Sequence, residues 1–139
     1  MMNPGTSRMP PVTGILETAL YVDDVDRSVR FYQDLFGFEP VSSGARLTAL
    51  AVPGKQVLLL FKKGASLNLP TIPHDGTGQL HMAFAIDRSE LEPWADRLKE
   101  KGIAIVDRIE WERGGVSLYF RDPDQHLIEL ATPGLWSNY

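Results

Sequence analysis

Hydrophobic and polar residues alternate in two segments of this chain that match each other at a constant offset. Residues 15–23 and 79–87 both show a period of two, which predicts half-buried β-strands. Glu17 in the first segment corresponds to His81 in the second. The chain is therefore predicted to contain a doubled scaffold with an ionisable residue at the same place in each half.

Each of these strands leads into a helical pattern. The first helix is expected from near Asp26 to Phe36, with Gly37 supplying the left-handed residue that ends it. The second is expected to begin at Ser89, with Glu92 completing a capping box. The helices should cover the faces of the two strands that carry Leu16, Leu20, Leu80 and Phe84.

Further strand-like segments complete each half. They lie near residues 46–52, 56–61, 103–110, 115–120 and 126–131. Each half therefore reads as a strand, a helix and two or three more strands, which is typical of an α+β fold. The expected organisation is a flexible N-terminal tail (1–12), module one (13–62), a connecting loop or lid (63–78), module two (79–132) and a C-terminal tail (133–139).

Two of these connecting segments have alternative interpretations. Residues 63–78 are rich in Pro and Gly, so they form either a linker or a lid over a pocket, with His74 as a contact. In the C-terminal tail, Trp136 either folds back onto the core or a dimer contact, or lines the pocket.

Three ionisable residues stand where strands usually carry apolar side chains: Glu17, His81 and Glu129. Alternation places Glu17 and His81 on the face opposite the helices, beside the small residues Ala19 and Ala83. Two carboxylates and one imidazole suit a divalent metal and leave positions open for substrate. Each residue also has a simpler interpretation, as a structural histidine or a surface acid.

Composition and net charge argue against several kinds of partner and location. The net charge of −4 argues against a nucleic-acid partner. The chain has no cysteine, which excludes disulfides and thiolate ligands and suits a reducing cytosol. No apolar run approaches the roughly 18 residues of a membrane span, and the N-terminus does not read as a signal peptide. A cytoplasmic protein without membrane or nucleic-acid contacts is expected.

Several motifs together resemble a known family. They are Leu20-Tyr21-Val22-Asp23-Asp24, Phe31-Tyr32, Leu35-Phe36-Gly37-Phe38, His81-Met82-Ala83-Phe84, Tyr119-Phe120-Arg121-Asp122-Pro123-Asp124 and Ile128-Glu129-Leu130. This pattern resembles the vicinal oxygen chelate superfamily, which includes glyoxalase I, fosfomycin-resistance thiol transferases, bleomycin-resistance proteins, methylmalonyl-CoA epimerase and extradiol dioxygenases. The resemblance implies two paired βαβββ modules forming a cupped mixed sheet.

The resemblance also implies a metal-ligand set. By position, Glu17 corresponds to the metal ligand on the first strand of module one, and His81 corresponds to the ligand on the first strand of module two. Glu129 corresponds to the ligand on the last strand of module two. The fourth place, in Val57-Leu58-Leu59, is apolar, which argues against a four-ligand glyoxalase I site. Glu17 stands where His or Gln is commoner, which argues against the two-His-one-Glu iron chemistry of extradiol dioxygenases.

The leading functional hypothesis is a glyoxalase-like metal-dependent enzyme of the lyase or isomerase type. One divalent ion per site (Zn, Ni, Mn, Mg or Fe) would chelate a small substrate and stabilise an enediolate or oxyanion. Glu129 or Glu17 would act as the base. The resemblance further implies a homodimer whose sites form between modules of two chains.

Three other functions are also compatible with the sequence. The first is a metal-free small-molecule or antibiotic-binding protein that holds its guest through Tyr21, Trp111 and Tyr119, although such aromatic residues also pack in cores and interfaces. The second is a thiol transferase with Arg46, Arg113 or Arg121 as cationic contacts. The third is a dioxygenase of the same superfamily. The sequence does not identify the substrate.

Overall fold

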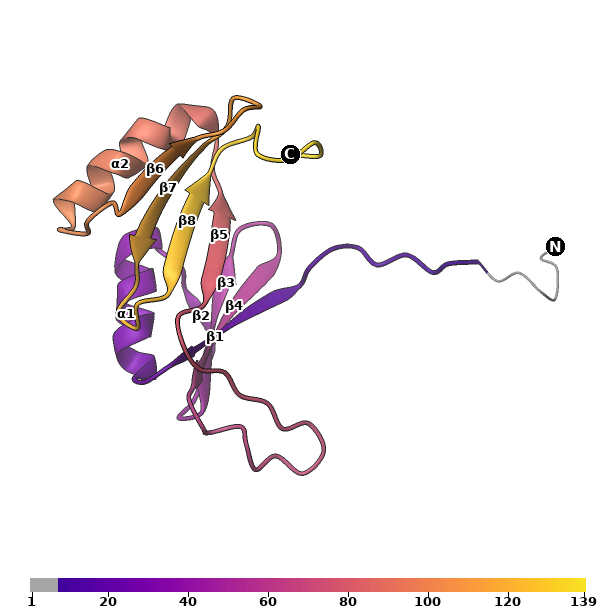
Figure 1. Ribbon diagram of the computed structural model, residues 1–139. Helices are drawn as coiled ribbons and strands as arrows, with labels where there is room; N and C mark the ends of the chain where they lie inside the picture. Colours follow the sequence, from indigo (N-terminus) through magenta and orange to yellow (C-terminus); the bar gives the residue numbers. More distant parts are fainter. Residues whose placement is uncertain (1–7) are drawn as a thin grey trace.

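The computed structural model describes residues 8–139. The predicted tail, residues 1–12, therefore lies partly outside the described residues. Residues 8–16 have no regular secondary structure and are exposed, with Met9 and Val12 each 89% exposed. They lead away from the body of the molecule as an extended arm (Figure 1).

The remaining residues form two modules with the same order of elements. Module one comprises β1 (Glu17–Val22), α1 (Val25–Phe36), β2 (Pro40–Ser43), β3 (Leu47–Val52) and β4 (Gln56–Lys62). Module two comprises β5 (His81–Ala85), a short 3-10 turn (Arg88–Glu90), α2 (Leu91–Glu100), β6 (Asp107–Glu110), β7 (Val116–Arg121) and β8 (Leu127–Ala131). The predicted α+β fold of paired βαβββ modules is confirmed.

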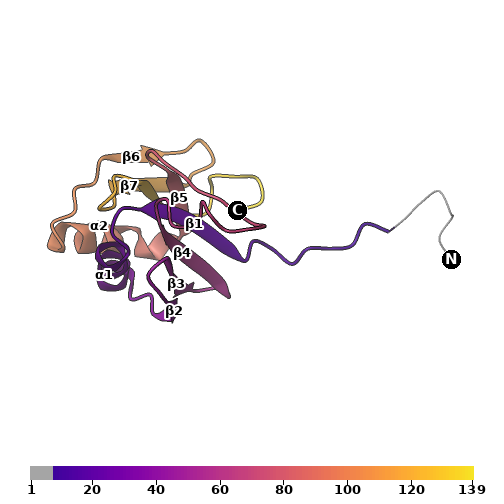
Figure 2. The ribbon, with the colours of Figure 1, turned by 90° about the horizontal axis from the view of Figure 1, so that it is seen from below.

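Each module has a four-stranded mixed sheet. The strand orders are β1-β4-β3-β2 and β5-β8-β7-β6. In both, the first strand runs parallel to the last strand of its module, and the other pairs are antiparallel. Both helices lie on one side of the molecule (Figures 1 and 2), which leaves the opposite face of each sheet, its open face, uncovered by them.

Helix α1 begins and ends as the sequence predicts, whereas α2 does not. The Asp24 carboxylate accepts a hydrogen bond from the Arg27 N–H, and Gly37 closes α1 with φ 75°. The predicted capping box of Ser89 and Glu92 is wrong: no side-chain cap bond forms there, because a 3-10 turn delays the helix to Leu91. Glu92 pairs with Arg108 instead, at 2.7 Å.

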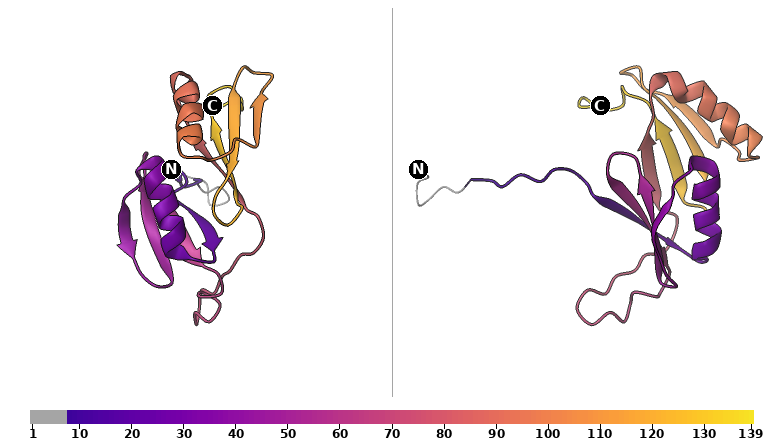
Figure 3. Two further views of the ribbon diagram at one scale, coloured as in Figure 1. Left: turned by 90° about the vertical axis from the view of Figure 1, so that its left-hand side faces the viewer. Right: turned by 180° about the vertical axis from the view of Figure 1, so that it is seen from behind.

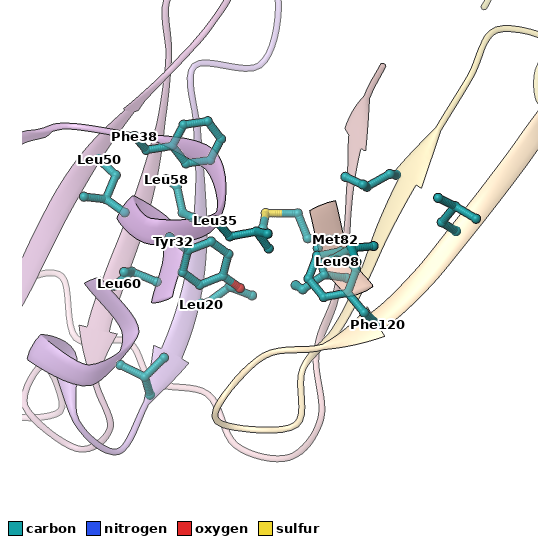
Figure 4. Packing of buried hydrophobic residues seen from close by; sticks show 14 of the residues in the cluster. Leu20, Tyr32, Leu35, Phe38, Leu50, Leu58, Leu60, Met82, Leu98 and Phe120 are labelled. Carbon is teal, nitrogen blue, oxygen red and sulfur yellow. The ribbon is translucent and has the colours of Figure 1, made fainter. Parts of the chain in front are cut away.

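The core lies between the two modules, around α1. Figure 4 shows Tyr32 and Leu35 of α1 between the leucines of the first sheet and Met82 of the second. Phe36 of α1 contacts Phe84 of β5, with ring centroids 4.8 Å apart. Because one helix fills the space between both sheets, the modules share one continuous core.

Two expectations about the strands are wrong. Leu16, expected under a helix, is 64% exposed, because β1 begins only at the next residue. The strand expected at 103–110 is limited to β6, and residues 103–106 have no regular structure.

The turn between β7 and β8 joins the modules through buried polar groups. Tyr32 donates a hydrogen bond to the Asp122 carboxylate at 2.8 Å. The fully buried His126 accepts from the Leu80 N–H at Nδ1, so Nε2 carries the proton and donates to the Tyr21 carbonyl at 2.8 Å. His126 thus links β1 of module one to the start of β5.

Within residues 8–139, no helix is both long enough and apolar enough to span a membrane.

Candidate functional site

Two of the three predicted metal ligands meet on the open face of module two. His81 begins β5, and Glu129 lies on the neighbouring strand β8, paired in register with Ala83. The His81 Nε2 atom lies 3.1 Å from Glu129 Oε1. The Glu129 side chain is 7% exposed and that of His81 is 50% exposed, so the pair consists of a buried carboxylate and an imidazole that is half exposed to solvent.

The backbone fixes which nitrogen of His81 carries a proton. His81 Nδ1 lies 2.9 Å from the Leu127 carbonyl oxygen. Because a carbonyl only accepts, Nδ1 must be the protonated nitrogen. A neutral His81 then turns the lone pair of Nε2 toward Glu129. This arrangement is how proteins orient a histidine that binds a metal.

The second oxygen of Glu129 is held by a chain of hydrogen bonds from β7. Ser117 donates to Glu129 Oε2 at 2.5 Å, and Trp111 Nε1 donates to Ser117 Oγ at 2.8 Å. An indole N–H only donates, so the single hydroxyl proton of Ser117 must point at the carboxylate. This chain leaves Oε1 directed toward His81.

Tyr119 completes the polar end of the site. Its ring stacks on His81, with centroids 6.3 Å apart. Burial raises the pKa of Tyr119, and the neighbouring Glu129 carboxylate raises it further. The phenol therefore stays protonated at neutral pH and can donate a hydrogen bond to a bound molecule.

These residues open into a cavity of about 470 Å³, within the range of small-molecule sites. Its polar end carries His81, Glu129 and Tyr119. Its remaining lining residues are apolar or aromatic: Ala83, Phe84, Ala85, Trp111, Ala131, Leu135, Trp136 and Tyr139. Small residues on β5 and β8 keep space open in front of the polar groups.

The third predicted ligand stands apart within one chain. Glu17 begins β1 of module one, pairs in register with Val57 and is exposed. Among residues 8–139, no three His, Cys, Asp or Glu side chains gather closely enough to hold a metal. A single chain therefore supplies His81 and Glu129 together, without Glu17.

The predicted substrate-binding residues divide between two places. Trp111 and Tyr119 line the cavity, whereas Tyr21 and Arg121 do not. The Tyr21 hydroxyl hydrogen-bonds His74 Nδ1 at 2.7 Å on the open face of module one. Arg121 donates to the Gln125 carbonyl at 3.0 Å.

The connecting loop is held against module one. Gly76 lies so near the Tyr21 ring that an added Cβ would come within 2.4 Å of it. Arg46 donates to Ser66 Oγ at 2.8 Å, and the Gly64 N–H donates to Asp75 Oδ1 at 3.0 Å. Figure 3 shows the loop projecting below module one. None of its residues lines the cavity at His81.

Sequence reasoning missed Ser117 and the pocket-lining role of Tyr139 and Leu135. The signal for Ser117 was present, because it lies two residues before Tyr119 and so shares the face of that strand. The tail after β8 has no periodicity that would predict its path. Trp136 lines the cavity, which was one of its two expected places.

Comparisons with known proteins identify the family of this chain. Residues 14–130 match the model of the Glyoxalase/Bleomycin resistance protein/Dioxygenase superfamily. The chain is 33% identical over 125 residues to metallothiol transferase FosB of Shouchella clausii, covering 87% of this chain and 81% of that protein. It is 33% identical over 119 residues to glutathione transferase FosA of Serratia marcescens, covering 84% of this chain and 78% of that protein.

A solved structure gives the same result at the level of the fold. The crystal structure of lactoylglutathione lyase from Agrobacterium tumefaciens superposes with a TM-score of 0.86 at 35% identity, covering 92% of this chain and 99% of that one. These relatives are named as transferases and a lyase, so enzymes of more than one reaction class share this scaffold. The chain belongs to the glyoxalase/bleomycin resistance protein/dioxygenase superfamily.

Proposed function

We propose that this protein is a metal-dependent enzyme that acts on a small substrate through two neighbouring oxygens, with a glyoxalase-like lyase or isomerase reaction. The observation that carries the proposal is the approach of His81 Nε2 to Glu129 Oε1 at 3.1 Å. With the Nδ1 proton donated to Leu127, two electron-rich atoms face each other across that distance. A cation between them, either a proton or a metal ion, makes this arrangement favourable.

The donor set fits a divalent metal. An imidazole nitrogen and a carboxylate oxygen are ligands for Zn²⁺, Ni²⁺, Mn²⁺ and Fe²⁺, and additional carboxylate donors suit Mg²⁺. His81 and Glu129 would hold the ion, and both are already oriented by neighbouring groups. When bound, such an ion would polarise the oxygens of a chelated substrate and stabilise their developing negative charge.

A second copy of the chain would supply the third ligand. Strands β1 and β5 are both edge strands that pair with a neighbour on one side only, and they carry Glu17 and His81 at equivalent places. Ile15 and Leu16, next to Glu17, are 73% and 64% exposed. Unpaired edges and exposed apolar residues favour association. We therefore infer a homodimer in which the partner's Glu17 approaches His81 and Glu129.

The chain's own groups can carry the proton transfer of an isomerisation. Glu129 or the partner's Glu17 would take the proton from the hydroxyl-bearing carbon beside a carbonyl and return it to the former carbonyl carbon. The hydroxyl proton would pass to the former carbonyl oxygen, so no oxidant or reductant is consumed. Ser117 would keep one oxygen of Glu129 in place. Tyr119, kept protonated by its raised pKa, would donate a hydrogen bond to a substrate oxygen.

Thiol transfer to an epoxide is the second candidate, and the names of the relatives favour it. FosB and FosA are a metallothiol transferase and a glutathione transferase. One feature of the site weighs against an anionic epoxide substrate: among the described residues, no Lys or Arg lines the cavity. A metal-free binding protein remains the third candidate.

The proposal is tested by assaying protein loaded separately with Mn²⁺, Zn²⁺ and Ni²⁺. Isomerisation of the hemithioacetal that methylglyoxal forms with the uncharged thiol 2-mercaptoethanol, and addition of the same thiol to a neutral epoxide, are the two reactions to follow. Metal-dependent turnover that is lost in His81→Ala and kept in the exposed control Glu100→Gln would support an enzyme, and the reacting substrate would identify its class. No metal-dependent turnover with either substrate class would favour the binding protein.

A further inference from the structure

The C-terminal segment, residues 133–139, forms one wall of the cavity and ends in a compact turn. The Gly134 N–H donates to the Tyr139 carbonyl at 2.8 Å, and the Tyr139 N–H donates to the Trp136 carbonyl at 3.1 Å. Figure 1 shows this segment curling beside β8, on the side away from α2. Its three largest side chains, Leu135, Trp136 and Tyr139, all line the cavity.

Two contacts hold this wall in place. The Tyr139 hydroxyl donates to the Ala131 carbonyl at 2.7 Å. The backbones of Gly115 and Gly134 pass so close together that a Cβ added to Gly134 would lie 2.5 Å from the Gly115 nitrogen. A segment with these contacts has a defined position, so its aromatic side chains are held next to the site.

The cavity is divided by polarity. One end carries the metal-binding pair His81 and Glu129. Ala83, which pairs in register with Glu129, and the next pair along the strands, Ala85 and Ala131, form an alanine floor that continues from the polar pair. Alanine carries only a methyl group, so this floor leaves a shallow space. Around this floor lie aromatic walls that include Trp136 and Tyr139.

Trp136 is the clearest sign that this apolar end takes a ligand. It is 69% exposed although it lines an apolar part of the cavity, and Trp111, which follows β6 and also lines the cavity, is 39% exposed. Burying a large aromatic side chain is favourable because it removes apolar surface from water. Two exposed tryptophans beside a floor of alanines therefore favour binding of a ligand that covers them. The described residues that line the cavity include no Lys or Arg, so an anionic substituent would find no cationic side chain at this end.

We propose that the C-terminal segment selects substrates in which the oxygen-bearing group is attached to a flat, uncharged apolar substituent, such as a phenyl ring. This inference rests on the proposed function for the oxygen-bearing end. The substituent would lie over the alanine floor and against Trp136, while its oxygens face His81 and Glu129.

Hydroxamates provide a matched set of probes, because they share one chelating group. Acetohydroxamate, benzohydroxamate and phosphonoacetohydroxamate would be titrated into Mn²⁺-loaded protein by calorimetry. Benzohydroxamate is expected to bind about tenfold or more tighter than acetohydroxamate, since covering a phenyl ring gains on the order of 25 cal/mol per Å². The phosphonate is expected to bind weakest. In Trp136→Ala the preference for phenyl over methyl should fall to about twofold or less, and in the exposed control Val41→Ala it should persist.

A measurement without metal separates this inference from the proposed function. The fluorine NMR signal of 4-fluorobenzyl alcohol should broaden with chelator-treated wild-type protein and with Val41→Ala, and it should stay sharp with Trp136→Ala. If Mn²⁺ fails to bind but this pattern holds, the metal proposal fails and the aromatic site stands. If Mn²⁺ binds while phenyl and methyl probes bind equally, the inference is overturned. It is equally overturned if Trp136→Ala acts only by changing the mass measured by light scattering, because the segment is then a dimer contact.

Discussion

The open faces of the two modules have matching backbones but different chemistry. In module two, Ala83 pairs with Glu129, and in module one the equivalent Ala19 pairs with Leu59. One sheet thus carries a carboxylate that accepts from Ser117 and faces His81, whereas the other carries a leucine at the same place. Glu17 has the same place as His81 but no acid beside it. The two modules share equivalent backbone positions. Among the described residues, module two has the side chains that orient a pair of proposed metal ligands, and module one does not.

The largest effect is expected from removing the charge of Glu129. Glu129→Gln keeps the shape and the bond from Ser117 but loses the anionic oxygen that faces His81. Its affinity for Mn²⁺, measured by titration calorimetry, should fall by more than about a hundredfold, because losing a ligand should exceed the roughly 10- to 100-fold loss caused by mutating supporting residues. The exposed control Glu100→Gln should bind as wild type. Equal affinity in both variants would contradict the assignment of module two as the metal-binding half.

A smaller loss is expected from the supporting hydrogen bonds. Ser117→Ala removes the donor to Glu129 Oε2, so Mn²⁺ affinity should fall by about 10- to 100-fold, as for other groups that orient metal ligands. Trp111→Phe keeps an aromatic side chain but removes the N–H, so a loss of Mn²⁺ affinity of about threefold to tenfold is expected. Unchanged affinity in Trp111→Phe would mean that Trp111 acts only as a cavity wall.

The junction of the two modules is expected to respond to pH. Burial raises the pKa of Tyr32 well above its ordinary value of 10.0, and the Asp122 charge raises it further. Because the folded protein holds this proton more tightly than the unfolded chain, the contribution of Tyr32 is fully present below about pH 10. It is lost as the pH rises through the folded value.

Tyr32→Phe tests this contribution. The variant should lower the free energy of unfolding by about 1–3 kcal/mol at pH 7, because it leaves the buried Asp122 carboxylate without its donor. The free energy of unfolding, measured with urea at pH 7, 9 and 10.5, should also fall less steeply with rising pH in the variant than in wild type. If the free energy of unfolding depended on pH in the same way in both proteins, Tyr32 would not be the group that causes the loss of stability at high pH.

The remaining expected effect is a gain in metal affinity, and it addresses the difference between the modules directly. Leu59→Glu places a carboxylate at the position equivalent to Glu129. If the open face of module one meets the site of a partner chain, Mn²⁺ affinity should rise by about tenfold, which is about 1.4 kcal/mol. Val41→Glu, on the far strand of the same sheet, is the control. No gain in the Leu59 variant would mean that this face does not approach the site.

The sequence predicted the fold well because repeated alternation is a local signal. The same signal placed Glu17 and His81 on the face opposite the helices. That His81 lies beside Glu129 depends on the pairing of β5 with β8, which alternation alone does not predict. It failed for Leu16, where alternation continues past the end of the strand. A face can be predicted from period alone, but the end of a strand depends on whether a neighbour is present to pair with it.

Other parts of the site depend on contacts between distant segments. The bond from Trp111 to Ser117 requires the β6–β7 hairpin to place an indole over the next strand. The position of Tyr139 depends on its bond to the Ala131 carbonyl. Neither contact leaves a periodic pattern, so sequence reasoning named Trp111 as a substrate contact, offered Trp136 only as an alternative pocket residue, and did not find Leu135 or Tyr139. The predicted metal ligands themselves, Glu17 included, stay a prediction until metal is measured.

The most direct test of the account is the metal content of untagged protein, purified without chelators and compared with His81→Ala prepared in the same way. The account predicts about one equivalent of a divalent ion per chain in wild type, and little or none in the variant, with both proteins folded by circular dichroism. Equal metal in the two proteins, or none in wild type even after reconstitution with Mn²⁺, Zn²⁺ and Ni²⁺, would contradict a metal site at His81 and Glu129.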